Sequence, residues 1–297
     1  MSVTRQSPDQ ALTAASTSRF VQTTKWRLHI NEAGQGHPLI MLHGAGPGAG
    51  GWTNFSRNIG ELSKKYRVIL MDFPGFNQSD EFDPESGERH AANAEAVKLL
   101  MDELKIEKAT LIGNSLGGFA TLMFSSLYNN RISQAILMGT PAPMIGPPHF
   151  YSPGGVSEGL KILWETYADP SPENFLKLVN IMVYDGSFAT KELAHERSDQ
   201  AKLNLKHLSN WIKGLPLIAQ ATPEMKSLWE KLSQMQTPTM VIHGRDDRVV
   251  SVENGLRNAA LIPNSTLVVF NRCGHWAQIE HAEKFNSLVD TFLRTTA

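Results

Sequence analysis

The sequence is poor in three features that would place it in a specialised class of protein. It has one cysteine in 297 residues, so it cannot form an internal disulfide, and a disulfide-stabilised secreted scaffold is excluded. No apolar run approaches the roughly 20 residues that a membrane-spanning helix requires. Neither charge is in excess, because 28 Lys and Arg face 29 Asp and Glu. This balance offers no electrostatic surface for nucleic acid or an anionic membrane.

The remaining composition is that of a globular protein. Hydrophobic residues make up 41% of the chain and charged residues 19%, which is too apolar and too weakly charged for intrinsic disorder. The first twenty residues are polar and lack the apolar segment of a signal peptide, so we expect a cytoplasmic protein. The length allows one large domain or two of ordinary size.

Short apolar runs alternate with helix-like stretches along most of the chain. The runs are rich in Val, Ile and Leu and are bounded by Gly, Pro, Asn or Asp, as expected for strands buried on both faces. This alternation predicts an α/β fold with a mostly parallel central sheet and helices on both faces. The predicted strands are 38–42, 67–71, 109–112, 134–138, 239–243 and 266–270.

One interval, between Gly139 and Pro238, contains no run that resembles a strand. A crossover between parallel strands needs about a dozen residues, so the interval is several times too long. It carries too many aromatic and aliphatic residues for a solvated linker. We therefore predict a helical lid at 140–237, inserted into a core domain that consists of 1–139 and 238–297.

A G-x-S-x-G sequence, 113–117, lies between the strand 109–112 and a helix-like run. This strand–turn–helix context is the one that the nucleophile motif requires. The glycines permit a sharp turn that exposes Ser115 at the start of the helix, although an ordinary glycine-rich turn would look similar. A serine hydroxyl is a weak nucleophile and needs an adjacent base.

An acid and a base follow the serine along the chain. Asp247 lies just after the strand 239–243 and His275 just after the strand 266–270. Open α/β sheets place their sites at these strand ends, and the order Ser, Asp, His is that of α/β hydrolases. We predict a catalytic triad of Ser115, Asp247 and His275. Asp246 is the rival for the acid, unless it caps the local turn or pairs with an arginine.

The glycine-rich loop 43–52 directly follows the first predicted strand. Such a loop can aim a backbone N–H at a developing oxyanion, and the residue after the nucleophile supplies a second N–H. We predict that Ala45 and Leu116 are these donors. Phosphate binding is the competing interpretation, but the loop has no Walker lysine and no G-x-G-x-x-G helix start.

No metal or cofactor is expected, since CxxC, HExxH and paired His/Glu spacings are absent. Cys273 has no separate base beside it and is predicted to pack in the core. His43 and His243, which each precede a glycine at a strand end, are predicted to have structural hydrogen-bonding roles. Dehalogenases and epoxide hydrolases of this fold use a carboxylate at the nucleophile position, so Ser115 argues against both.

With these motifs the chain resembles the meta-cleavage-product hydrolases, which hydrolyse carbon–carbon bonds during bacterial degradation of aromatic and steroid rings. The resemblance begins near residue 18 and reaches the C-terminus. It implies an α/β-hydrolase fold with a helical lid inserted after strand 6, and we expect a homo-oligomer. Its narrowest marks are HGAGPGAGGWTN and CGHW, and it also rests on STSRF, NEAG, DFPGFNQSD, GNSLGG, MVYD and GRDDRVV.

The resemblance further implies a reaction. The family's substrate is a 2-hydroxy-6-oxo-2,4-dienoate, in which Ser115 would attack the C6 carbonyl with His275 as its base, giving a carboxylic acid and a 2-hydroxydienoate. Arg197 would lie near the substrate carboxylate, which its planar guanidinium can bind bidentately. The substrate-binding residues implied are Gly44, Gly46, Asn54, Asn114, Arg197 and Trp276.

Two positions depart from the family pattern. Ala45 stands where the family often has glycine, and it fits only if the position does not require a positive φ. The segment 140–144 replaces a glycine-rich stretch beside the acyl pocket, so the group on C6 (aryl, alkyl or steroid-derived) stays open.

A carboxylesterase and a receptor-like homologue are the alternative functions. The predicted pocket walls are Met144, Phe150, Met182 and Val183.

Overall fold

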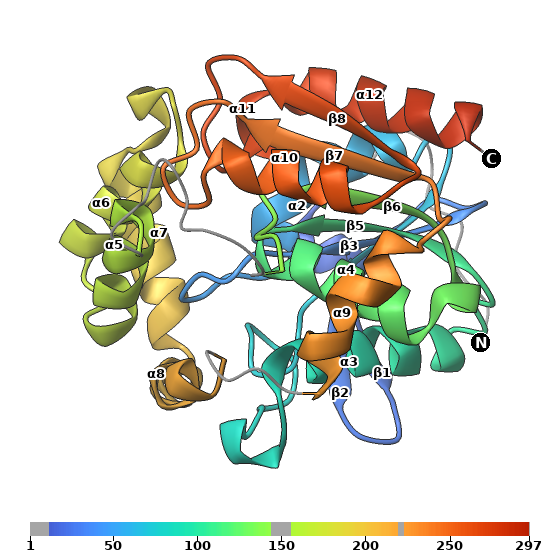
Figure 1. The fold of residues 1–297 in the computed structure, drawn as a ribbon. Coiled ribbons are helices and arrows are strands. Elements are labelled where there is room, and N and C mark those ends of the chain that lie inside the picture. Colours follow the sequence, from blue (N-terminus) through green and yellow to red (C-terminus); the bar gives the residue numbers. More distant parts are fainter. Residues whose placement is uncertain (1–11, 144–155, 219–222, 297) are drawn as a thin grey trace.

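The computed structural model describes residues 12–143, 156–218 and 223–296. A central sheet has the strand order β1-β2-β4-β3-β5-β6-β7-β8 (Figure 1). The strands from β3 to β8 pair in parallel, whereas β1 and β2 are antiparallel to their neighbours. The strands are β1 (Ser18–Gln22), β2 (Arg27–Ala33), β3 (Pro38–Leu42), β4 (Arg67–Met71), β5 (Ala109–Asn114), β6 (Ile132–Met138), β7 (Thr239–Gly244) and β8 (Ser265–Phe270).

All six predicted strands are present to within two residues at either end, and the predicted fold class is confirmed. The sequence analysis missed the hairpin of β1 and β2, because neither strand is an apolar run. In β1 only Val21 is buried, and β2 buries the polar side chains of His29 and Asn31. Both side chains are hydrogen-bonded, His29 to Asp72 and Asn31 to Thr17.

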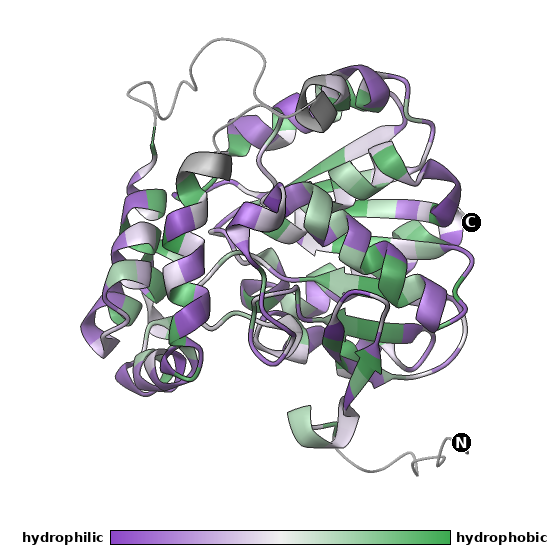
Figure 2. Ribbon diagram, turned by 90° about the horizontal axis from the view of Figure 1, so that it is seen from below, coloured by the Kyte–Doolittle hydropathy of each residue, from purple (hydrophilic) through white to green (hydrophobic). Residues whose placement is uncertain are grey.

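Helices cover both faces of the sheet. One face is covered by α2 (Gly51–Leu62), α11 (Ala277–Glu280) and α12 (Ala282–Thr295). The other face is covered by α3 (Arg89–Glu103), α4 (Leu116–Leu127) and α10 (Val252–Leu261). Figure 2 shows hydrophobic residues gathered in the strands and hydrophilic ones on the outer helices, as burial of apolar area requires. The short helices are α1 (Ala14–Thr17), η1 (Pro84–Ser86), η2 (Asn129–Arg131) and η3 (Gly186–Phe188).

Between β6 and β7 the described residues form helices and no strand. Four of these helices pack on one another at one side of the molecule (Figure 1): α5 (Glu158–Ala168), α6 (Pro172–Met182), α7 (Lys191–Lys202) and α8 (Leu205–Ile218). A fifth, α9 (Pro223–Ser233), packs instead against α4 and α10 of the core. We therefore propose that α5–α8 are the lid and that the chain has already returned to the core at α9. Within the described ranges, no helix is long and apolar enough to cross a membrane.

Candidate active site

The turn between β5 and α4 holds Ser115 in a strained conformation, with φ 54° and ψ −112°. A positive φ is unusual for a residue other than glycine and indicates stored strain at a functional position. The flanking glycines make this turn possible. A Cβ on Gly113 would lie 2.2 Å from the carbonyl oxygen of Gly117, and one on Gly117 would lie 2.1 Å from that of Leu42. The G-x-S-x-G sequence therefore produces the sharp turn that it predicts, with a half-buried Ser115 on the cavity wall.

Asp247 and His275 meet where β7 and β8 end, and both are buried. The Asp247 Oδ2 and His275 Nδ1 atoms are 2.7 Å apart, and Asp247 Oδ1 accepts the backbone N–H groups of Val249 and Val250 at 2.8 and 2.9 Å. Burial alone would raise the pKa of Asp247. The charge of His275 and hydrogen bonds with His243 and His275 outweigh burial and lower that pKa below its ordinary value. Asp247 is therefore an anion held in position to orient the imidazole.

The neighbouring carboxylate, Asp246, has different partners. It pairs with Arg245 at 3.1 Å and accepts the backbone N–H of Cys273 at 3.3 Å, so it closes the local turn. Burial raises the pKa of the Cys273 thiol, which suits a packing residue. Of the two aspartates, Asp247 is the one that contacts His275.

Ser115, Asp247 and His275 line one large cavity between the core and the lid. The structure brings all three predicted triad residues together, and their roles stay a prediction. Within the described residues no hydrogen bond joins the Ser115 hydroxyl to the His275 ring. Such bonds are often long in enzymes without substrate and tighten in the complex.

The two predicted oxyanion donors also lie on this cavity. Leu116 is the first residue of α4, so its N–H has no acceptor within the helix. Ala45 is not one of the described non-glycine residues with positive φ, so alanine fits there without strain. The loop is fastened by Asn54, whose Oδ1 accepts the N–H of Gly44 at 3.3 Å and whose Nδ2 donates to the Gly50 carbonyl at 3.3 Å.

The six residues predicted to bind substrate, Gly44, Gly46, Asn54, Asn114, Arg197 and Trp276, all line the cavity. Asn114 connects two parts of the site, because its Nδ2 donates to the carbonyls of Met138 and His275 at 3.3 and 3.4 Å. Its Oδ1 is buried and has no hydrogen-bond partner among the described residues. Asn54 and Asn114 thus use some of their hydrogen-bonding groups to hold the backbone around the site in place.

Arg197 reaches the cavity from α7 of the lid. Its guanidinium donates to the Thr53 carbonyl of α2 at 3.0 Å, and it forms no ion pair with a carboxylate in the described part of the chain. Burial lowers the pKa of this guanidinium, and the charge of Glu196 opposes that shift. A partly buried cation without a counter-ion is costly, so the arrangement favours an anionic ligand.

The predicted pocket walls are only partly right. Met182 lines the cavity, whereas Val183 does not: it is buried beside it, and its carbonyl accepts a hydrogen bond from Arg248 at 3.0 Å. Met144 and Phe150 lie outside the described residues. The sequence analysis missed further lining residues because no motif marks them: His90 of α3, Trp164 of α5, Phe175 of α6, Tyr184 after α6 and Trp211 of α8.

Comparisons with known proteins agree with the predicted fold and family. Residues 37–282 match the alpha/beta hydrolase fold family. The chain is 42% identical over 290 residues to a 2-hydroxy-6-oxononadienedioate/2-hydroxy-6-oxononatrienedioate hydrolase of Cupriavidus pinatubonensis, covering 96% of this chain and 98% of that protein. It is 43% identical over 300 residues to the 2-hydroxy-6-oxo-6-phenylhexa-2,4-dienoate hydrolase of Burkholderia cepacia, covering 95% and 98%.

A solved structure has a similar fold and a related sequence. A mutant of the meta-cleavage product hydrolase of Pseudomonas fluorescens IP01, complexed with acetates, is 30% identical with a TM-score of 0.78, over 95% of this chain and 100% of that one. The chain belongs to the meta-cleavage-product hydrolase family. Because the relatives of this meta-cleavage-product hydrolase are named as hydrolases, family membership favours an enzyme over the receptor-like alternative.

Proposed function

We propose that this meta-cleavage-product hydrolase cleaves the C5–C6 bond of a 2-hydroxy-6-oxo-2,4-dienoate, giving a carboxylic acid and a 2-hydroxydienoate. One observation carries the proposal: the guanidinium of Arg197 has no carboxylate partner in the described chain and opens into the cavity of Ser115 and His275. An ester of a neutral alcohol would not need this cation. The names of the relatives, which are dienoate and dienedioate hydrolases, support the same substrate class.

The first half of the reaction acylates the serine. His275 takes the hydroxyl proton of Ser115 on Nε2, because its Nδ1 is engaged by Asp247. The oxygen attacks the C6 carbonyl, and the N–H groups of Ala45 and Leu116 stabilise the oxyanion. In other enzymes, one such donor lowers the activation free energy by about 2.7–4 kcal/mol.

Carbon is a poor leaving group unless its charge is delocalised. When the dienol has tautomerised to the 2-oxo form, the electron pair of the broken C5–C6 bond spreads from C5 through the C3–C4 double bond to the C2 carbonyl. Arg197 binds the adjacent C1 carboxylate and favours this shift of charge. The proton on His275 then passes to the product, which leaves as the 2-hydroxydienoate after tautomerisation.

The second half hydrolyses the acyl-enzyme. His275 takes a proton from water, the hydroxide attacks the Ser115 ester at the same oxyanion donors, and the serine leaves with the proton. One water is consumed for each carbon–carbon bond broken. The same histidine serves both halves as base and then acid.

The test follows loss of the coloured dienoate with phenyl, alkyl and steroid-derived groups on C6, with p-nitrophenyl esters as the control. Turnover of dienoates that exceeds ester turnover supports the proposal. Faster turnover of esters alone would favour the carboxylesterase. A Ser115→Ala variant that still releases product at the wild-type rate would overturn the nucleophile assignment.

We also propose a homo-oligomer in the cytoplasm. The strand β8 ends the sheet order, so one of its edges is unpaired among the described strands, and Val269 on it is 42% exposed. Exposed sheet edges favour association with a second chain. Light scattering after size-exclusion chromatography tests the assembly, and cell fractionation tests the location.

A further inference from the structure

The C-terminal end of α6, in the proposed lid, is held by groups from the loops that carry Asp247 and His275. Carbonyl groups at the end of a helix have no partner within the helix. The Met182 carbonyl accepts the backbone N–H of His275 at 2.7 Å, and the Val183 carbonyl accepts an N–H of the Arg248 guanidinium at 3.0 Å. The predicted base is therefore joined to the proposed lid through its own backbone.

The two backbones approach closely because residue 274 is glycine. A Cβ at Gly274 would lie 2.6 Å from the Met182 carbonyl oxygen and 2.8 Å from the Val183 carbonyl carbon, so a larger residue would push them apart. Residues 271–276, the histidine loop, thus pack directly on residues 182–185, the α6 end segment. The first contains CGHW and the second is MVYD, so two separate motifs of the sequence meet at this contact.

One carboxylate, that of Glu280 at the end of α11, bridges the histidine loop and the α6 end segment. Its Oε1 accepts the backbone N–H of Gly274 at 2.7 Å. Its Oε2 accepts the backbone N–H groups of Tyr184 and Asp185 at 2.7 and 3.2 Å. Hydrogen bonds to an ionised acceptor are stronger than those between neutral groups, so this bridge fixes the distance between the two segments.

The helix that carries Glu280 is itself fastened to the core. The Asn58 side chain of α2 donates to the Gln278 carbonyl at 3.1 Å, and the Arg57 guanidinium donates to the Ile279 carbonyl at 3.3 Å. The carboxylate therefore projects from a fixed helix. Glu280 is not among the described residues that line the cavity, so we expect it to make no contact with substrate.

Resting on the proposed function, we propose that Glu280 is a positioning residue for His275 and that the α6 end segment helps it to hold the histidine loop. The hydrogen bond between Asp247 and Nδ1 orients the ring, whereas Glu280 and the Met182 carbonyl hold the backbone from which the ring projects. Proton transfer between Ser115 and Nε2 needs both to be fixed, because acid–base catalysis requires hydrogen-bond distance. Loss of Glu280 should therefore slow the chemical step and leave substrate binding unchanged.

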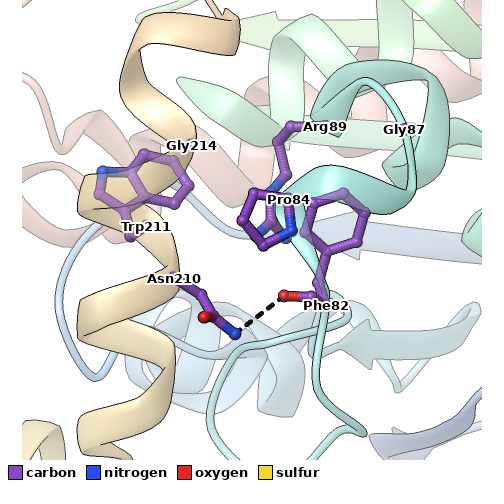
Figure 3. A pocket seen from close by; sticks show the side chains of 7 residues that line it. All are labelled: Phe82, Pro84, Gly87, Arg89, Asn210, Trp211 and Gly214. Atoms are coloured by element: carbon purple, nitrogen blue, oxygen red, sulfur yellow. Dashed lines mark hydrogen bonds between the residues drawn. The ribbon is translucent and has the colours of Figure 1, made fainter.

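A second contact between the proposed lid and the core offers a matched control. Figure 3 shows Asn210 of α8 pointing toward Phe82, and its Nδ2 donates to the Phe82 carbonyl at 3.1 Å. This contact involves neither the histidine loop nor the α6 end segment, so Asn210→Ala weakens docking of the lid without touching the support of His275. Glu283→Ala, at an exposed position of α12, makes the same change of residue as Glu280→Ala.

The test measures single-turnover rate constants with a dienoate and with a p-nitrophenyl ester, because both reactions need His275. In Glu280→Ala both rate constants should fall at least tenfold. The Kd for the dienoate, measured by absorbance titration with and without Glu280→Ala in a Ser115→Ala background, should change less than threefold. Asn210→Ala and Glu283→Ala should keep both rate constants within threefold of wild type.

Two further variants perturb the same contact in different ways. Glu280→Gln keeps the shape of the side chain but has one acceptor oxygen for N–H groups on two sides, so its rate constants should lie between those of Glu280→Ala and wild type. Gly274→Ala places a Cβ 2.6 Å from the Met182 carbonyl oxygen and should lower both rate constants as Glu280→Ala does.

A smaller loss of rate in Glu280→Ala, an equal loss in Asn210→Ala, or a weaker Kd without a loss of rate would overturn the positioning role. If urea titration shows that Glu280→Ala is unfolded, Glu280→Gln is judged instead, with a loss of threefold or more expected and a smaller one overturning the role. A wild type that hydrolyses the ester but no dienoate would overturn the proposed function alone, since the ester still reports on His275.

Discussion

Replacing Arg197 by Gln gives the sharpest test of substrate recognition. The guanidinium donates one N–H to the Thr53 carbonyl at 3.0 Å. Its other N–H groups are left to bind a ligand in the cavity. A charge-assisted hydrogen bond contributes about 1.5–3 kcal/mol, and about 1.36 kcal/mol corresponds to a tenfold change in rate. The kcat/KM for a dienoate should therefore fall roughly 10- to 150-fold.

Two controls separate this effect from general damage. A p-nitrophenyl ester has no carboxylate for Arg197, so its hydrolysis by Arg197→Gln should change less than threefold. Arg245→Gln removes another cavity-lining arginine, which is exposed and paired with Asp246, and should change dienoate kcat/KM little. The free energy of unfolding of Arg197→Gln should stay within about 1 kcal/mol of wild type, because loss of one hydrogen bond is offset by relief of a buried cation. Unchanged dienoate kcat/KM, or an equal loss for the ester, would refute the reasoning.

Three further predictions concern the triad and the fold. Ser115→Ala should abolish turnover but still bind dienoate, which equilibrium absorbance titration can show; a failure to bind would contradict it. The pKa of Asp247 is lower in the folded than in the unfolded chain, so its charge stabilises the fold above about pH 4 and that contribution is lost as the pH falls further. Asp247→Asn should accordingly flatten the acid side of the melting-temperature profile, and an unaltered profile would argue against this ion. Gly113→Ala places a Cβ 2.2 Å from a backbone oxygen and should lower the free energy of unfolding by at least about 2 kcal/mol, whereas Gly60→Ala, with open space at that Cβ, should raise it by about 0.5–1 kcal/mol in urea titrations.

The sequence predicted the parallel part of the sheet well, because strands buried on both faces must be continuous apolar runs. It could not predict β1 and β2 in the same way. There His29 is buried as the partner of Asp72, and no local pattern shows which distant residue will satisfy a buried polar side chain. The predicted lid 140–237 includes α9, and our proposal that the lid ends before this helix rests on packing contacts that a helical pattern does not show.

For the site, chain order and motif context were enough to choose Ser115 and His275. Asp247 was also the predicted acid, but its rival Asp246 follows the same strand, and only the coordinates show that Asp247 is the one that contacts the imidazole. The suitability of alanine at position 45 likewise depended on a backbone angle. His90 and Trp211 carry no motif, and only the coordinates show that they line the cavity.

The hydrogen bond between Arg197 and Thr53 links the proposed lid to the core at the point where we propose that the substrate carboxylate binds. A movement of α7 away from α2 would break this bond and carry the cation out of the site. Substrate binding and docking of the lid on the core are then thermodynamically coupled. A change that favours the docked lid raises the affinity for the carboxylate, and binding of the carboxylate favours the docked lid by the same factor. An inert dienoate analogue should therefore protect the amides of α7 from hydrogen exchange, and Arg197→Gln should remove that protection.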